Sequence, residues 1–242
     1  MHKIPSILSA LLLVLLLQAG ASAQDYRPYL KRAQLPDGAL YLPAPPDSSS
    51  VAFFNDWLQY RRGKALRDTP RGAQAAAEAE DDAEALAEIF SGPFGFEISE
   101  DDTPAIYELL GRSADTVGGS TGSAKRRYMR MRPYVLYGEP TLVPDEEESH
   151  RRTGSYPSSH SATGWGAALV LSEVNPDHAE AILKAGYEYG QSRVIAGYHF
   201  QSDVDAARLA AAAAVARLHN DKTFQKDLEK AKKEYARLSS RK

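Results

Sequence analysis

The 242-residue sequence contains no cysteine. Disulfides therefore cannot hold the fold together, and thiolate catalysis and cysteine-based zinc sites are excluded. The fold has to be stabilised by burial, and the chain is long enough for one domain with a substantial core. A large excess of charge is also missing, because the formal net charge is −3. That balance offers no general attraction to nucleic acid or to anionic membranes.

Long apolar runs are scarce, and the clearest one stands at the amino terminus. Lys3 precedes an almost unbroken apolar stretch over residues 7–17, and Ala21-Ser22-Ala23 matches the small-x-small pattern of a signal-peptidase site. The stretch is roughly half as long as a membrane-spanning helix needs to be. We therefore expect residues 1–23 to be a cleaved signal peptide rather than an anchor, Gln24 to be the mature amino terminus, and the mature protein to have no membrane span.

Strict alternation of β-branched residues is missing as well, and helix signals dominate from residue 51 onward. Residues 51–242 are expected to form one all-α helical bundle. The preceding segment, 24–50, is rich in proline and ends in Ser48-Ser49-Ser50. Because proline opposes helix formation, this segment is expected to be an extended arm that lies over the domain and contains no helix.

Proline after a residue that can cap a helix predicts three helix starts. These starts are Thr69-Pro70, Thr103-Pro104 and Asn175-Pro176. The first helix is expected to run to Phe90 and to stop at Gly92-Pro93, and the second to reach Arg112. Further helices are predicted over 161–174, 177–196, 202–219 and 224–238. The glycine-rich stretch 117–123 is compatible with a loop or with a closely packed helix.

The first of three polar groups is the basic run that begins at Lys125 and ends at Arg132-Pro133. On a helix, seven residues make almost two turns, so Lys125 and Arg132 would share one face. Pro133 moves Arg132 out of helical geometry, which ends the helix and can aim the guanidinium inward. A solvated basic surface is the alternative interpretation of such a run.

The second group is the stretch Gly154-Ser155-Tyr156-Pro157-Ser158-Ser159-His160, which precedes an apolar helix. Small residues at a helix entrance expose backbone N–H groups, and these favour an anion together with the helix dipole. The Ser158 hydroxyl can add a further donor. The alternative is an ordinary capping loop in which His160 is a surface or core histidine.

The third group contains Arg193, His199 and Asp203. His199 and Asp203 stand four residues apart, so the carboxylate can reach the ring at the start of a helix. Such a contact fixes the tautomer of the ring and leaves its other nitrogen as a nucleophile. Arg193 offers a planar fork for two phosphate oxygens. Alternatively, Asp203 simply caps the next helix. The acidic run 145–148 is expected to be a solvated loop and not a metal site.

In this order and spacing, the three groups resemble the tripartite signature of the type 2 phosphatidic acid phosphatase superfamily, which vanadium haloperoxidases share. The surrounding sequence is closer still to the class A bacterial non-specific acid phosphatases, and the likeness covers most of residues 40–215. It is carried by Asp68-Thr69-Pro70-Arg71-Gly72, Gly154 to Ser158, Gly164 to Leu171, Gly186-Tyr187-Glu188 and Gln201 to Asp205. Ser159 departs from the pattern, because the family usually has glycine there.

The resemblance implies an all-α fold with His199 as nucleophile, Asp203 as the residue that orients it, and His160 as general acid and base. The implied phosphate-binding groups are Lys125, Arg132, Ser158, Arg193 and the Ser159 amide. The implied protein is a periplasmic acid phosphatase that uses no metal or other cofactor, acts on small phosphate monoesters including nucleotides, and self-associates. Two alternatives share the pocket: a vanadium-dependent haloperoxidase, or a phosphate-binding protein with little turnover if Ser159 impairs the site.

Overall fold

The computed structural model describes residues 27–240. Within that range all regular secondary structure is helical, and there is no strand. The predicted signal peptide lies outside the described residues. The shorter elements are η1 (Arg32–Gln34), α1 (Gly38–Tyr41), α3 (Pro70–Ala77), η2 (Gly119–Thr121), α6 (Gly122–Tyr128), α7 (Pro133–Tyr137), η3 (Pro144–Glu146), α8 (Glu147–His150) and η4 (Pro176–His178). The longer ones are α2 (Val51–Ala65), α4 (Ala83–Phe94), α5 (Pro104–Gly118), α9 (Ser159–Val174), α10 (Ala179–Ala196), α11 (Gln201–Leu218) and α12 (Lys222–Ser239). The all-α prediction is confirmed.

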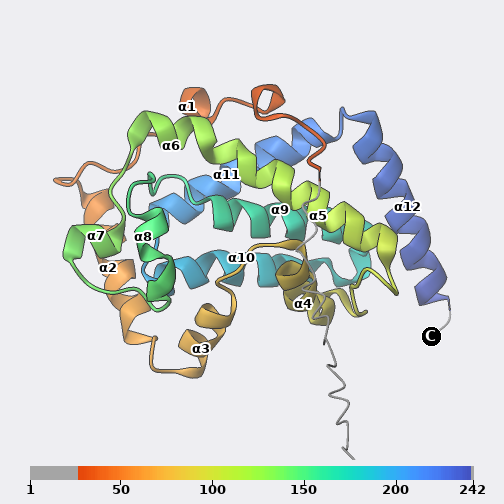
Figure 1. Cartoon of the computed structure of the whole chain (residues 1–242), viewed down its shortest axis with the longest axis horizontal. Helices are drawn as coiled ribbons and strands as arrows, with labels where there is room; N and C mark the ends of the chain where they lie inside the picture. The colour runs from red at the N-terminus through yellow and green to blue at the C-terminus, as the bar shows by residue number, and fades with distance from the viewer. Residues whose placement is uncertain (1–26, 241–242) are drawn as a thin grey trace, which may run out of the picture.

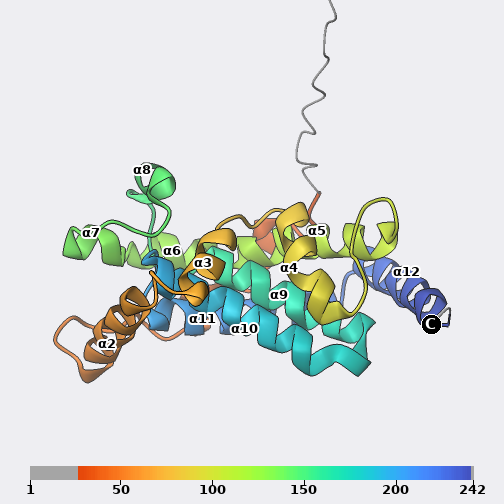
Figure 2. The same cartoon turned by 90° about the horizontal axis from the view of Figure 1, so that it is seen from below.

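Helix α9 is the centre of the bundle. It contacts α5, α10 and α11. In Figure 1 it lies between α11 and α10, and in Figure 2 it lies between α5 on one side and α10 and α11 on the other. Small and apolar residues occupy all sides of α9 rather than one stripe, which is the pattern of a helix surrounded by protein. No helix within residues 27–240 is long and apolar enough to cross a membrane.

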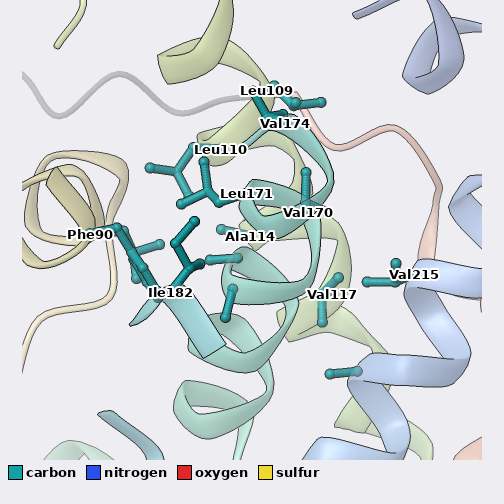
Figure 3. Close-up of a cluster of buried hydrophobic side chains, with 14 of the residues drawn as sticks. Phe90, Leu109, Leu110, Ala114, Val117, Val170, Leu171, Val174, Ile182 and Val215 are labelled. Atoms are coloured by element: carbon teal, nitrogen blue, oxygen red, sulfur yellow. The ribbon is translucent and has the colours of Figure 1, made fainter. Parts of the chain in front are cut away.

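The hydrophobic core fixes the position of α9. Figure 3 shows Val170, Leu171 and Val174 of this helix among side chains of its neighbours. Those neighbours are Leu109, Leu110, Ala114 and Val117 of α5, Phe90 of α4, Ile182 of α10 and Val215 of α11. Full burial of one such aliphatic or aromatic side chain stabilises the fold by about 1.5–3 kcal/mol. The cluster therefore holds the carboxyl-terminal half of α9 and, through a rigid helix, the position of its amino terminus.

Close approach of α9 and α10 depends on glycine. A Cβ atom on Gly186 would lie 2.4 Å from the Cβ of Ala168, and one on Gly164 would lie 2.1 Å from a ring carbon of Tyr189. Both distances are impossible for real atoms, so these two glycines let the helices meet. The contact brings the Tyr189 ring against the amino-terminal half of α9.

The helix predicted from Pro70 to Phe90 is wrong in two places. Helix α3 ends at Ala77, and α4 begins at Ala83 after Asp82, whose side chain accepts a hydrogen bond from the Ala85 N–H. This second cap begins a new helix inside the alanine-rich stretch. Helix α4 also continues through Pro93 and ends at Gly95, whose left-handed conformation (φ 81°) ends the helix.

The arm over residues 27–50 was predicted to contain no helix, but it contains η1 and α1. Neither turn includes a proline, and Asp37 caps α1 by accepting from the Ala39 N–H. The arm lies over the bundle: the Tyr29 N–H donates to Thr116 Oγ1, Leu30 is buried, and α1 contacts α6 (Figure 1).

The remaining predictions of helices are mostly confirmed. Helices α9, α10, α11 and α12 lie within about two residues of their predicted ranges, and α5 runs six residues past Arg112 to Gly118. The stretch 117–123 is helical, formed by the end of α5, η2 and the start of α6. Thr69 caps its helix, whereas the Thr103 and Asn175 side chains bond to neighbouring loop and helix-end backbone instead.

Candidate active site

The three polar groups of the sequence meet at the amino-terminal end of α9. Lys125 comes from α6 and Arg132 from the linker before α7. Ser158, Ser159 and His160 form the entrance of α9. Arg193 lies in the last turn of α10, His199 in the turn that follows, and Asp203 in the first turn of α11. The structure thus brings together all eight residues that the sequence had singled out.

Arg132 reaches the site from extended backbone, not from a helix shared with Lys125. Helix α6 ends at Tyr128, Met129 adopts a left-handed conformation (φ 41°), and Arg132 is extended before Pro133, which begins α7. Arg132 is extended, as Pro133 predicts, but the helix ends at Tyr128 and not at Arg132, and the predicted common helix face is wrong. The Arg132 side chain is buried, with Nη1 3.1 Å from His199 Nε2 and Nη2 3.0 Å from Thr153 Oγ1.

The surroundings of His199 determine its tautomer. A guanidinium can only donate, so Nε2 of His199 accepts from Arg132 and the ring proton lies on Nδ1. Burial, followed by the positive charges of Arg132, Lys125 and Arg193, lowers the pKa of His199 well below its ordinary value. Burial and these charges favour the neutral ring, and its Nε2 lone pair lies among cations.

Ser155 connects His199 to Asp203. Nδ1 of His199 lies 3.5 Å from Asp203 Oδ2, which is longer than a good hydrogen bond, and 3.3 Å from Ser155 Oγ. The Ser155 hydroxyl donates to Asp203 Oδ2 at 2.5 Å, so it can accept from the His199 ring. Asp203 Oδ2 also accepts from the Phe200 N–H at 2.8 Å, at the start of α11. Asp203 thus caps its helix and faces the histidine as well.

Arg130 and Asp56 complete this network, and the sequence did not single out either residue. Arg130 Nη1 lies 2.6 Å from Asp203 Oδ1, and Nη2 lies 2.7 Å from Asp56 Oδ2 on α2. Burial opposes the charge on Arg130, but the two carboxylates raise its pKa. Arg130 belongs to the basic run from Lys125 to Arg132, so its place near two candidate residues could be seen in the sequence. Asp56 carries no local signal, because its partners lie far along the chain.

His160 and Arg193 have unsatisfied polar atoms. The His160 ring stacks on Tyr189 at 4.3 Å, and its Nδ1 lies 3.7 Å from Asp81 Oδ2. Its Nε2 is buried without a partner among residues 27–240, and the same holds for Nε and Nη1 of Arg193. Buried polar atoms almost always have partners, so three orphans in one place indicate a site for a ligand. Two of them are guanidinium donors, which require an acceptor such as a phosphate oxygen.

The entrance of α9 provides further donors. Ser158 Oγ accepts from the N–H and the hydroxyl of Ser161, at 3.2 and 2.9 Å, which leaves its own proton free to donate. Ser159 is the first residue of α9, where backbone N–H groups lack a partner within the helix. Met129 is the one non-glycine residue with positive φ within 27–240. Serine in place of the family's glycine therefore causes no backbone strain here.

Lys125 supplies a charge that depends on pH. Its Nζ donates to the Gly154 carbonyl at 2.8 Å. Desolvation, together with the charge of Arg132, lowers the pKa of Lys125 to about 7. Burial also lowers the pKa of Arg132, to about 10, so the guanidinium stays charged in acid and at neutral pH. The full set of cations is present only below about neutral pH.

The acidic run 145–148 was predicted to be a solvated loop; it is helical instead, although Asp145 and Glu148 are exposed. Its residues lie in η3 and in the first half of α8, and Glu146 Oε2 lies 3.7 Å from Arg193 Nη2. The Glu147 side chain accepts from the Thr141 N–H at 2.6 Å. These contacts place the run beside the site. Within residues 27–240 no group of three or more His, Asp or Glu side chains is arranged to hold a metal ion.

Comparison with known proteins shows the superfamily and the family of this chain. Residues 110–226, which include all eight candidate residues, match the PAP2 superfamily. A non-specific acid phosphatase of Providencia stuartii is 50% identical over 87% of this chain and 85% of its own length. A non-specific acid phosphatase of Salmonella typhimurium is 42% identical over 88% of this chain and 86% of its own length. An acid phosphatase of Zymomonas mobilis is 34% identical over 82% of this chain and 75% of its own length. The chain belongs to the non-specific acid phosphatase family.

Replacement of Ser155 by alanine tests the link between His199 and Asp203. We expect kcat for hydrolysis of 4-nitrophenyl phosphate to fall about 10- to 100-fold. Losses of this size are typical when a residue that orients a metal-binding histidine is removed, and Ser155 orients His199 in the same way. KM should change little, because Ser155 holds the histidine and not the phosphate. Ser172→Ala, on the far end of α9, is the matched control and should leave kcat unchanged. A Ser155→Ala enzyme with wild-type kcat would contradict the assigned link.

Replacement of Lys125 by arginine tests the pH dependence. Because the pKa of Lys125 is about 7, wild-type protein loses this charge above neutral pH, whereas arginine keeps it. The inhibition constant of methylphosphonate, measured at about pH 5.5 and about pH 8.5, should rise more steeply with pH in the wild type than in the variant. Lys64→Arg, at an exposed ion pair with Glu139, serves as control. Equal slopes for the wild type and Lys125→Arg would show that another group controls binding.

Proposed function

We propose that this protein is a periplasmic acid phosphatase that hydrolyses a broad range of small phosphate monoesters, nucleotides among them, through a phosphohistidine on His199. Membership of the family makes it a phosphoric monoester hydrolase, and the breadth, the intermediate and the location are the proposal. The main supporting observation is the set of unpaired donors on Arg193 and His160 beside the neutral, acceptor nitrogen of His199. A phosphate bound here would offer acceptor oxygens to the unpaired donors of Arg193.

In the first step, His199 Nε2 attacks phosphorus. The N–P bond forms while the bond from phosphorus to the ester oxygen breaks, and the leaving oxygen takes a proton from His160. Ser155 accepts from Nδ1–H, and Asp203, which Ser155 binds, stabilises the positive charge that the ring acquires. Around the transferring group, oxygen charge is neutralised by Lys125, Arg132 and Arg193, with donors from Ser158 and the Ser159 amide.

In the second step, His160 is neutral and removes a proton from water as the water oxygen bonds to phosphorus. The N–P bond breaks, phosphate is released and His199 returns to its neutral form. Burial, followed by the charges of Arg193 and His199, lowers the pKa of His160 well below its ordinary value. The negative charge of a bound phosphate opposes those effects, so proton uptake by His160 accompanies substrate binding. Acidic solution favours that uptake, and it also keeps Lys125 charged. Both effects predict higher activity in acid than in base.

Replacement of His199 by alanine tests the proposed nucleophile. We expect turnover of 4-nitrophenyl phosphate to fall by at least about 10³, because the covalent route is lost. Wild-type protein, mixed with ³²P-labelled substrate and quenched in alkali, should carry label that the variant lacks. His219→Ala, an exposed histidine paired with Glu173, is the control. Inactivation of the wild type by EDTA, or halide oxidation by the vanadate-loaded protein with no ester hydrolysis, would contradict the proposal.

Export is supported by the basic start, the short apolar run and Ala21-Ser22-Ala23. The absence of cysteine also suits a protein that folds outside the cytoplasm without forming disulfides. In a Gram-negative host that expresses the full chain, the protein should appear in the osmotic-shock fraction. Its first residue by amino-terminal sequencing should be Gln24. Retention of Met1 in the cytoplasmic fraction would contradict both the cleavage and the location.

A further inference from the structure

We propose that the phosphate site continues into a second anion subsite, lined by Arg32, Arg126 and Arg152, which favours substrates whose leaving group carries a phosphate of its own. The inference rests on the proposed function, because the subsite is defined by its contact with the phosphate-binding residues. It adds a substrate class that the reaction itself does not require.

The subsite is a cavity of about 350 Å³ next to the entrance of α9. It shares Lys125, Gly154 and Ser159 with the active site, so a ligand bound to those groups can extend into it. The volume is at the lower end of small-molecule sites, and suits one phosphate with a few further atoms. The other lining residues are Arg32, Gly118, Gly119, Thr121, Gly122, Arg126, Met129, Arg152 and Thr153.

The charge of this cavity is uniformly positive. Four basic side chains line it, and no aspartate or glutamate lies among the described residues that do so. Arg32 and Arg152 make no ion pair within residues 27–240. The positive charge of Arg126 helps to lower the pKa of Asp37, after the larger effects of hydrogen bonds from Ser123 and Ala39. Asp37 itself does not line the cavity. In a chain with a net charge of −3, such a group favours an anionic ligand.

A neighbouring cavity of about 440 Å³ also reaches Ser159, and it differs in charge. It is lined by Asp81 and Asp115 together with Lys31 and Arg32. The mixture of signs gives this second cavity no strong preference for an anion. A phosphate on the leaving group is therefore directed towards the arginine-lined cavity, and not towards the side of His160 that faces Asp81.

Glycines form the floor of the arginine-lined cavity. Gly119 and Gly122 have ordinary helical backbone (φ −63° for both), so their conformation does not require glycine. Glycine at such positions destabilises a helix relative to alanine. A Cβ on Gly122 would lie 3.2 Å from Arg126 Nη1, and one on Gly119 would lie 3.6 Å from Arg32 Cγ. The Cβ on Gly122 would crowd the Arg126 guanidinium, whereas the Cβ on Gly119 would make only an ordinary contact, so Gly122 alone is tied to the position of an arginine.

The amino-terminal arm supplies Arg32. This residue is the first of η1, and the arm before it is fixed by the hydrogen bond from the Tyr29 N–H to Thr116 Oγ1 and by the buried Leu30. Arg126 comes from α6 and Arg152 from the loop before α9. Three separate segments therefore converge on the cavity, as expected of a binding site and not of one solvated helix face.

The chemistry in the subsite follows from the proposed reaction. His199 Nε2 forms the N–P bond with the terminal phosphorus, the P–O bond to the leaving group breaks, and His160 transfers its proton to the leaving oxygen. The second phosphate stays intact, held by the arginines. Sugar bisphosphates and nucleoside diphosphates both present this chemistry, and they differ in the spacing between the two phosphorus atoms.

The experiment compares three non-hydrolysable inhibitors of 4-nitrophenyl phosphate hydrolysis. Methylphosphonate occupies the phosphate site alone, methylenediphosphonate has the spacing of a diphosphate, and 1,3-propylenediphosphonate has a spacing nearer to that of a bisphosphate ester. Inhibition constants are measured for the wild type, Arg126→Gln, Arg152→Gln and the double variant. Arg127→Gln is the matched control, because Arg127 is an exposed cation on the same helix that does not line the cavity.

In wild-type protein at least one diphosphonate should bind more tightly than methylphosphonate. Each arginine variant should reduce that preference about threefold and the double variant about tenfold, with smaller effects in high salt, because the charges are exposed. Arg127→Gln should leave the preference unchanged. The diphosphonate whose affinity the arginine variants weaken more identifies the substrate class: methylenediphosphonate indicates a diphosphate anhydride, and 1,3-propylenediphosphonate indicates a bisphosphate ester.

Two outcomes overturn the inference, and they differ from failure of the proposed function. If the wild type hydrolyses 4-nitrophenyl phosphate but binds the diphosphonates no better than methylphosphonate, the subsite does not exist. If the preference exists but the arginine variants and Arg127→Gln change it equally, general surface charge explains it. If the wild type neither hydrolyses the ester nor is inhibited by methylphosphonate, the proposed function fails first.

Discussion

The buried charge network of Asp203, Arg130 and Asp56 is the constraint on which the site depends. A buried carboxylate without a partner is very costly, whereas one that is paired and hydrogen-bonded is tolerated. Arg130 lies between the two carboxylates at 2.6 and 2.7 Å. The network thereby ties α2, the segment after α6 and the start of α11 to one another. His199 takes its orientation from this network through Ser155.

The candidate phosphate pocket has the opposite character, because no carboxylate lies close to its cations: Lys125 and Arg132 bond to uncharged groups, and Glu146 lies 3.7 Å from Arg193. Arg193 keeps two unpaired nitrogens, and the cations around His199 lower its pKa instead of being neutralised. Such an arrangement costs stability in the empty protein, and a bound phosphate relieves that cost. The same charges that disfavour a protonated His199 are those that would attract and polarise a phosphate ester. The hydrophobic cluster around α9 provides the stability that an unpaired cationic site requires.

Much of the site could be predicted from the sequence, because its signals are local. Residues four apart on a helix lie close together, which identified His199 and Asp203. A serine before an apolar run predicts a helix start, and Ser158 caps α9. The helices α9 to α12 follow from composition and periodicity. Predictions failed where a second local signal competed, as at Asp82, which begins a new helix inside an alanine-rich stretch.

The sequence by itself determined the helical class and the family and indicated the candidate site residues, because helix propensity, caps and short spacings act within a few residues of one another. The tertiary structure alone decided that Asp56 pairs with Arg130, that Ser155 lies between His199 and Asp203, and that the arm brings Arg32 to the cavity. Those contacts join segments far apart in the chain. Packing of whole helices places them together, and no pattern of neighbouring residues encodes that packing.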